Sequence, residues 1–278
     1  MNGTGFRELI FLKQKMKKMI NNLIGLGAML LGATMAKKSG VKFFESSTYL
    51  GFEVNDTVLD FVKKSEGIEE RAYKLPNENQ YTIGYGTSYL FNANGTPLKN
   101  HGAVRQGDTL TALKLEMGYN SLSNLDFAEQ LVQNHLNASR YTKVAKDLDS
   151  FNVPFKKNFA EALMEMSYGS GSIFGRLSSD IYYVNFLIMA RNAKTDLDFA
   201  KAYIYYRYNY YKFCSLKGQW PTYQYGWMRR IVRLTNYIIG NNLSEIQLAS
   251  YVGNSGTSAN KKKLVDYVLT NFGLQIIW

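Results

Sequence analysis

The chain has 278 residues, of which 46% are hydrophobic and 20% are charged, so it is long enough for one globular unit with extensions at its ends. Its single cysteine, Cys214, excludes an intrachain disulfide and a multi-cysteine zinc site, and His101 and His135 lack a metalloprotease spacing, so we expect no metal and no other cofactor. The net charge of +11 predicts attraction to a polyanion, but the basic clusters, such as 261–263, are short and no groove-binding signature accompanies them, so we expect no nucleic acid partner.

Residues 1–50 combine a positively charged segment with a short apolar one. Four lysines precede an apolar stretch from Leu23 to Ala36: Lys13, Lys15, Lys17 and Lys18. The stretch is too short to span a bilayer comfortably, and the small residues at its end are typical of a secretory signal. Three interpretations stay open: a cleaved signal, a retained membrane anchor, and a retained helix that packs on a protein partner.

A helix is predicted from the region of Asn55 and Asp56 to about Ser65 or Glu66. Four apolar residues recur there with helical spacing: Val58, Leu59, Phe61 and Val62. Asn55 and Asp56 are good N-cap types, and Gly67 predicts the end of the helix. Glu66 is therefore expected at the C-terminal end, where the negative end of the helix dipole and apolar neighbours disfavour the charged form of a carboxyl group.

The next segment predicts a small antiparallel sheet. Residues 72–89 mix aromatic and β-branched residues with glycines, and residues 75–79 are typical of a turn. Just before it, residues 69–71 predict an exposed turn of mixed charge. Asn94 and Gly95 predict a further hairpin turn.

Beyond Thr109 the apolar spacing becomes helical. Three successive helices are indicated by apolar triplets: Phe127, Leu131 and Leu136; Val144, Leu148 and Phe151; and Phe159, Leu163 and Met166. A tyrosine-rich helix is expected at 196–211 and another from about Trp227 to Gly240. Two helical patterns at 243–252 and 261–274 are joined by the run 253–260, which predicts a flexible hinge. The class is therefore α+β, with a small antiparallel β lobe and a larger helical lobe.

One segment resembles a known family. The sequence SEGIEERAYKLPNENQYTIGYGT, residues 65–87, is similar to the active-site segment of the phage lysozymes, glycoside hydrolase family 24. In that family a Glu-Gly pair ends the first long helix, an Ala-Tyr step enters the sheet and a Thr-Ile-Gly-x-Gly strand crosses the cleft. The matching residues are Glu66, Gly67, Ala72, Tyr73, Thr82, Ile83, Gly84 and Gly86.

The resemblance continues more weakly through residues 152–174, which look like the family's central buried helix, and residues 226–234, which look like its Arg-rich closing helix. It implies a lysozyme-like catalytic domain at 51–240, an N-terminal signal-like, anchor or packing segment at 1–50, and a helical C-terminal extension at 241–278.

The resemblance also implies roles for single residues. Glu66 is expected to be the catalytic acid, and Thr82 is expected to help position the attacking water. The family's second carboxylate is missing, because Leu75 stands in its place; Glu78, at the tip of a longer loop, could supply it. Thr87 occupies a position where the family often has histidine, and is not expected to be catalytic.

Two further features follow from the match. In the family an arginine bridges the lobes to the acid, and Arg229 or Arg230 could be that partner. Among the six tyrosines in 203–211, helical spacing predicts that most are packing residues and that one or two at most contact sugar rings.

The implied activity is that of a muramidase, which hydrolyses the bond between N-acetylmuramic acid and N-acetylglucosamine in bacterial peptidoglycan as a phage enters or lyses its host. Glycoside cleavage needs one carboxylic acid to protonate the departing oxygen and a second group to handle water or positive charge. The expected location is the virion or the host periplasm and wall, with virion proteins or a membrane contacted through residues 1–50. Two alternatives stay open: an inactive virion or wall-binding protein with this fold, and a lytic transglycosylase.

Overall fold

The computed structural model describes residues 48–52, 56–74, 79–98, 101–137, 140–169, 180–213 and 220–276. Nearly all of the N-terminal segment predicted at 1–50 therefore lies outside the described residues. Within the described part of the chain, no helix combines the length and the apolar character needed to cross a membrane. The described residues belong to one compact unit that spans Ser47–Trp278.

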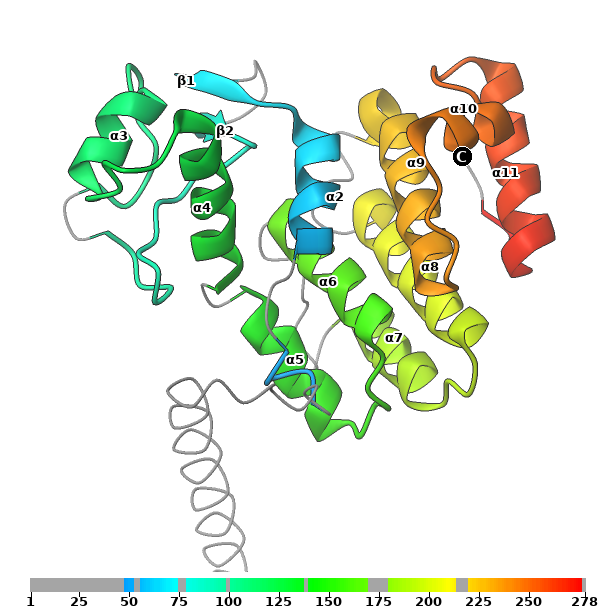
Figure 1. Cartoon of the computed structure of the whole chain (residues 1–278). Helices are drawn as coiled ribbons and strands as arrows, with labels where there is room; N and C mark the ends of the chain where they lie inside the picture. The colour runs from blue at the N-terminus through cyan, green and yellow to red at the C-terminus, as the bar shows by residue number, and fades with distance from the viewer. Residues whose placement is uncertain are drawn as a thin grey trace, which may run out of the picture. The chain divides into compact units, whose positions relative to one another are not determined.

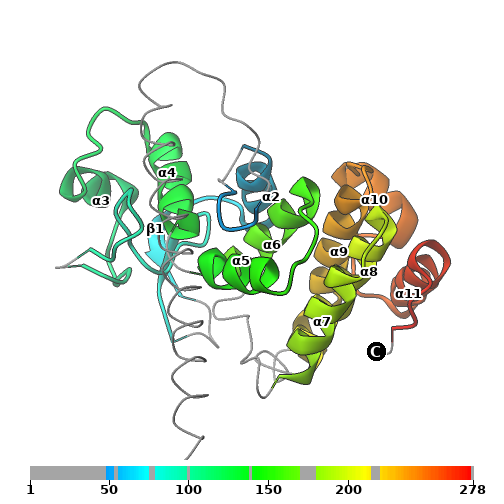
Figure 2. The ribbon, with the colours of Figure 1, turned by 90° about the horizontal axis from the view of Figure 1, so that it is seen from below.

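The described residues are mostly helical and contain one antiparallel sheet of two strands, which confirms the α+β class. Two views show the arrangement (Figures 1 and 2). The sheet, α3 and α4 lie on one side of α2, and α7 to α11 lie on the other side. Helix α6 packs against α2, α4, α5, α8 and α9, so it joins the two sides through the hydrophobic core.

Helix α2, Asp56–Glu66, forms as its apolar spacing predicts. Its residues Val58, Phe61 and Val62 are buried, and the helix packs against α6, Lys157–Gly169. Gly67 has a φ of +65°, a left-handed conformation that glycine adopts without steric cost, so the helix ends directly after Glu66.

The sheet pairs β1, Glu69–Tyr73, with β2, Thr82–Gly84. Glu69 pairs with Gly84 and Tyr73 pairs with Thr82, with an irregularity between the two pairs. The prediction of a turn at 69–71 is wrong, because these residues form the first part of β1. All three are exposed, so no apolar alternation indicated a strand; pairing of their backbone with β2 and, at Arg71, with Thr109 decides it.

The hairpin predicted at Asn94 and Gly95 is confirmed. Phe91 pairs with Pro97, and the backbone N–H of Asn92 donates to the carbonyl of Thr96 over 2.8 Å. Helix α3, Leu110–Glu116, follows, and its N-cap Thr109 accepts a hydrogen bond from the backbone of Ala112.

The apolar triplets of the helical lobe are confirmed as helix positions, except that Phe151 lies just after its helix. They belong to α4, Asn124–Asn137, α5, Arg140–Ser150, and α6. Helix α7, Ile181–Arg191, begins after Asp180, whose carboxylate accepts hydrogen bonds from the backbone of Tyr182 and Tyr183.

Helices α8, Asp196–Phe213, and α9, Trp220–Ile238, pack against each other. The sequence predicted that this last long helix starts near Trp227, but α9 begins at Trp220. Pro221 and Gly226 disfavour a helix in the sequence of its first turns. Pro221 is nevertheless compatible with a first turn, where a backbone N–H has no helical partner. The packing role predicted for most α8 tyrosines is confirmed for those that are buried: Tyr203, Tyr206, Tyr208 and Tyr210.

The chain ends in α10, Glu245–Val252, and α11, Ser258–Phe272. Five of their apolar side chains are buried in the same core as the rest of the unit: Leu248, Val252, Leu264, Val268 and Phe272. The flexible run predicted at 253–260 is shorter, because Thr257 caps α11. The side chain of Asn260 also donates to the carbonyl of Ser255 over 3.0 Å, which fixes the connection to the helix.

Candidate active site

Glu66 ends α2 at the place where the two sides of the molecule meet. Its Oε1 accepts a hydrogen bond from Nη1 of Arg230 over 2.7 Å, and its side chain is 26% exposed. Arg230 comes from α9, so two separate helices supply the two charges. A positive charge therefore lies beside the carboxyl group at the negative end of α2.

The choice left open between Arg229 and Arg230 is resolved by these contacts. Arg229 forms an ion pair with Glu245 at 3.5 Å, at the start of α10. Neighbouring residues on a helix point about 100° apart, so only one of the two can face α2. Arg230 is the residue that does.

Behind Glu66, a second ion pair is fully buried. Glu165 of α6 accepts hydrogen bonds from Arg230 and from Arg207 of α8, the latter over 2.7 Å. The side chains of Glu165 and Arg207 have no exposed surface. With Glu66, these residues form an arrangement of two carboxylates and two guanidinium groups, which we call the charge cluster. The two signs balance, which is the condition under which charges are tolerated inside a protein.

The charge cluster controls the ionisation of Glu165. Burial alone raises the pKa of this carboxyl group, but the guanidinium groups of Arg207 and Arg230 outweigh burial and hold the pKa below its ordinary value of 4.5. Glu165 is therefore a carboxylate at neutral pH. It fixes the guanidinium of Arg230, which in turn holds Glu66.

Gly86 lies directly beside the carboxyl group of Glu66. A Cβ atom at this position would lie 3.3 Å from Oε2 of Glu66, whereas the hydrogen bond from Arg230 goes to Oε1. Gly86 also has a φ of +82°, a backbone conformation that other residues rarely adopt. The residue therefore leaves space beside Oε2 of Glu66.

Tyr168 of α6 fixes the segment that contains Gly86. Its hydroxyl donates to the carbonyl of Tyr85 over 2.7 Å and lies 3.0 Å from Oγ1 of Thr87. Burial raises the pKa of Tyr168 far above its ordinary value, so the hydroxyl keeps the proton that it donates to Tyr85. Thr87 then donates to Tyr168. Thr87 is fully buried.

Thr82 is the first residue of β2 and is paired with Tyr73 of β1. Its side-chain oxygen is buried and has no hydrogen-bond partner among the residues that the structure describes. A buried hydroxyl without a partner costs free energy unless water or a ligand satisfies it. This is a property that a water-positioning residue would have.

The proposed second carboxylate, Glu78, and Leu75 both lie outside the described residues. The structure therefore relates Glu66, Arg230, Gly86 and Thr82 to the fold.

Sequence reasoning missed Glu165, Arg207 and Tyr168. One signal was present: Glu161 and Glu165 stand four residues apart in an otherwise apolar helix, and a glutamate on a buried face needs a cationic partner. Nothing in the sequence named that partner.

Comparison with known proteins identifies no relative: no protein-family model, no curated protein and no solved structure matches this chain.

Proposed function

We propose that the chain is a phage-type lysozyme with a lysozyme-like fold, a muramidase that hydrolyses the bond between N-acetylmuramic acid and N-acetylglucosamine in peptidoglycan. The observation that carries the proposal is the placement of Glu66. A carboxyl group ends the first described helix, is held by an arginine from a separate helix, and lies beside a glycine that follows a Thr-Ile-Gly strand.

The geometry around Glu66 suits a proton donor. Arg230 holds Oε1, so Oε2, on the side of Gly86, is the oxygen left to carry the proton to the departing glycosidic oxygen. Donation leaves a negative charge on Glu66. Arg230 stabilises that charge at 2.7 Å, and Glu165 keeps Arg230 in place.

The second half of the reaction requires a water molecule or a group that stabilises an oxocarbenium-like centre. Thr82 supports the first option, because its buried hydroxyl has hydrogen-bonding capacity that no described residue uses. Glu78 is the carboxylate that we propose to complete the site. The net charge of +11 supports binding to an anionic bacterial wall, either from a virion or after export to the host periplasm.

Incubation of the chain with purified peptidoglycan tests the proposal. We expect soluble fragments whose sugar ends, identified by mass spectrometry, are reducing muramic acid. Anhydro sugar ends would indicate that the chain cleaves peptidoglycan by transglycosylation and not by hydrolysis. Sedimentation of the chain with the wall without any release of fragments would contradict an enzymatic role and favour a wall-binding protein.

A substitution at Gly86 tests whether the space beside Glu66 matters for the reaction. We expect Gly86→Ala to reduce the rate of fragment release by about 10²-fold, because the new methyl group presses on the carboxyl group that must be positioned precisely. Gly118→Ala is the matched control. Gly118 has a similar φ of +77° but no atom within 4 Å of the added Cβ, so it carries the same backbone strain without the contact. Equal losses of activity in the two variants would contradict the prediction.

A further inference from the structure

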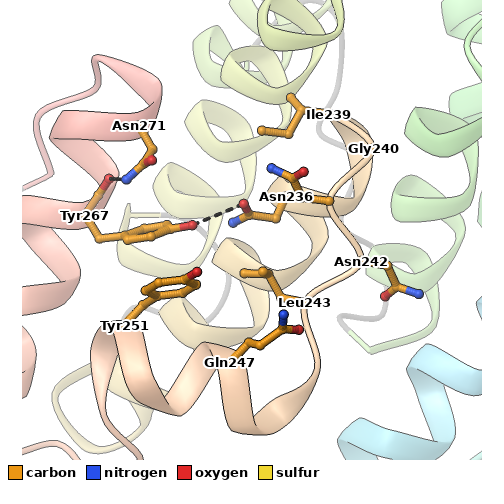
Figure 3. A pocket seen from close by; sticks show the side chains of 10 residues that line it. Asn236, Ile239, Gly240, Asn242, Leu243, Gln247, Tyr251, Tyr267 and Asn271 are labelled. Atoms are coloured by element: carbon orange, nitrogen blue, oxygen red, sulfur yellow. Dashed lines mark hydrogen bonds between the residues drawn. The ribbon is translucent and has the colours of Figure 1, made fainter.

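A pocket of about 530 Å³ lies outside the charge cluster, between the end of α9, the following loop, α10 and α11. We call it the amide pocket, because Asn236, Gln247 and Asn271 line it together with Tyr251 and Tyr267 (Figure 3). Its volume is in the range of small-molecule binding sites, about 300 to 1,000 Å³. None of the residues that line it is charged, although the chain as a whole is strongly basic. The pocket therefore suits a neutral polar ligand better than a phosphate or an acidic group.

Two tyrosine rings form one wall of the pocket. Tyr251 of α10 and Tyr267 of α11 are stacked, with ring centroids 5.5 Å apart and an interplanar angle of 28°. In Figure 3 the rings lie one above the other, and the hydroxyl of Tyr267 points toward Asn236. Tyr251 is 48% exposed, so a large aromatic surface stays open to a ligand.

The wall is held in place by hydrogen bonds through the buried side chain of Asn236. The hydroxyl of Tyr267 donates to Oδ1 of Asn236 over 3.1 Å, and Nδ2 of Asn236 donates to the carbonyl of Val232 over 2.8 Å. Asn236 is 2% exposed. These contacts fix the orientation of the Tyr267 ring before a ligand binds, which reduces the entropy lost on binding.

Gln247 presents a hydrogen-bond donor to the pocket. Its Oε1 accepts from the backbone N–H of Ser244 and from the hydroxyl of the same residue, in the capping box of α10. These bonds assign the oxygen of the amide, so Nε2 is the group left over. Within the described parts of the chain, Nε2 of Gln247 has no hydrogen-bond partner.

We propose that the amide pocket binds a neutral saccharide, with an apolar sugar face against Tyr251 and Tyr267 and with hydroxyl or acetamido oxygens accepting from Nε2 of Gln247. Aromatic rings offer the apolar contact that a sugar face needs, and side-chain amides both donate and accept hydrogen bonds. The choice of an N-acetylated sugar rests on the proposed function; the choice of a saccharide rests on the pocket. The site would hold the glycan at a distance from the bond that Glu66 is proposed to cut.

The test is an NMR titration of the full chain, carrying Glu66→Gln to prevent cleavage, with a soluble N-acetylglucosamine oligomer. We expect amide resonances of the pocket to shift with a saturable dependence on oligomer concentration. Tyr251→Ala, which removes the exposed ring, should weaken this binding about tenfold, on the scale of a lost aromatic contact. Gln247→Glu should weaken it similarly, because a carboxylate can still cap α10 but cannot donate.

Ile246→Ala is the matched control, since Ile246 lies on α10, is 83% exposed and does not line the pocket. The affinity of Ile246→Ala for the oligomer should equal that of the parent chain. Pocket resonances that do not move, or Tyr251→Ala and Gln247→Glu variants that bind the oligomer as tightly as the parent chain, would overturn the inference. The outcome is separate from that of the proposed function, because fragment release by the chain with Glu66 intact is measured independently. If the chain binds the oligomer in the pocket but releases no fragments, only the proposed muramidase activity is overturned, and the saccharide site stands.

Discussion

Glu66→Gln is expected to lower the rate of fragment release from peptidoglycan by about 10²- to 10⁴-fold, the usual contribution of a positioned general acid. Glutamine has almost the shape of glutamate, and its carbonyl oxygen can still accept a hydrogen bond from Arg230. It cannot give up a proton to a departing oxygen. The free energy of unfolding should change little, because the side chain is partly exposed and Arg230 keeps its contact with Glu165.

The rate is measured as soluble sugar released per unit time, and stability as the midpoint of urea unfolding. Glu70→Gln is the control, since Glu70 is an exposed glutamate on β1, close to Glu66 in sequence. Activity near that of the unaltered chain in Glu66→Gln would exclude Glu66 as the acid. Glu78→Gln, made in parallel, reports on the second carboxylate: a comparable loss supports a two-carboxylate reaction, and an unchanged rate leaves the second half of the reaction to Thr82 and water.

Arg207→Met is expected to destabilise the chain by about 3 to 5 kcal/mol, the cost of removing one partner of a buried ion pair. Arg207 and Glu165 are both completely buried, and methionine fills much of the same space without supplying charge or hydrogen bonds. Glu165 would keep only Arg230. The measurement is urea unfolding followed by far-ultraviolet circular dichroism, with the slope of the transition checked for a change in the unfolded state.

A double variant separates charge from packing. Glu165→Gln combined with Arg207→Met removes the charge that Arg207→Met leaves uncompensated, so its loss of stability should be smaller than the sum of the two single losses. Arg207→Lys keeps the charge but not the planar guanidinium that contacts both Glu165 and Tyr203, and should give an intermediate loss. Surface substitutions usually change the free energy of unfolding by no more than about 0.5 kcal/mol. A change that small in Arg207→Met would contradict a stabilising role for the buried ion pair.

The ion pair of Glu165 and Arg207 is expected to make the free energy of unfolding fall at acidic pH. The folded state holds the pKa of Glu165 below its ordinary value of 4.5, so the carboxylate is favoured by folding. Its contribution is fully present above that ordinary value and is lost as the pH falls through the lower pKa of the folded state. In Arg207→Met one of the opposing charges is gone, so the loss of stability should begin at a higher pH than in the unaltered chain.

Local sequence patterns determined the elements around the candidate site. The apolar spacing of residues 58–62 and the glycine at position 67 were sufficient to end α2 at Glu66. Asn94 and Gly95 were sufficient for the hairpin, and helical spacing was sufficient to assign most of the α8 tyrosines to the core. These features depend on residues a few positions apart, whose geometry is set by the backbone itself. Residues 69–71 show the limit: an exposed strand has no apolar alternation, and its pairing partner had to be known.

Only the tertiary structure decided which charges meet. Glu66 and Arg230 are 164 positions apart in the chain, and Arg229 has the same chemistry and nearly the same position in sequence. The rotation of α9 about its axis, which is set by packing against α6 and α8, turns Arg230 and not Arg229 toward Glu66 and Glu165. The same holds for Arg207 and for the wall formed by Tyr251 and Tyr267. The sequence alone supplied the glutamate and its helix end; the packing of distant helices supplied its partners, because side chains on separate helices meet only where their faces come together in the core.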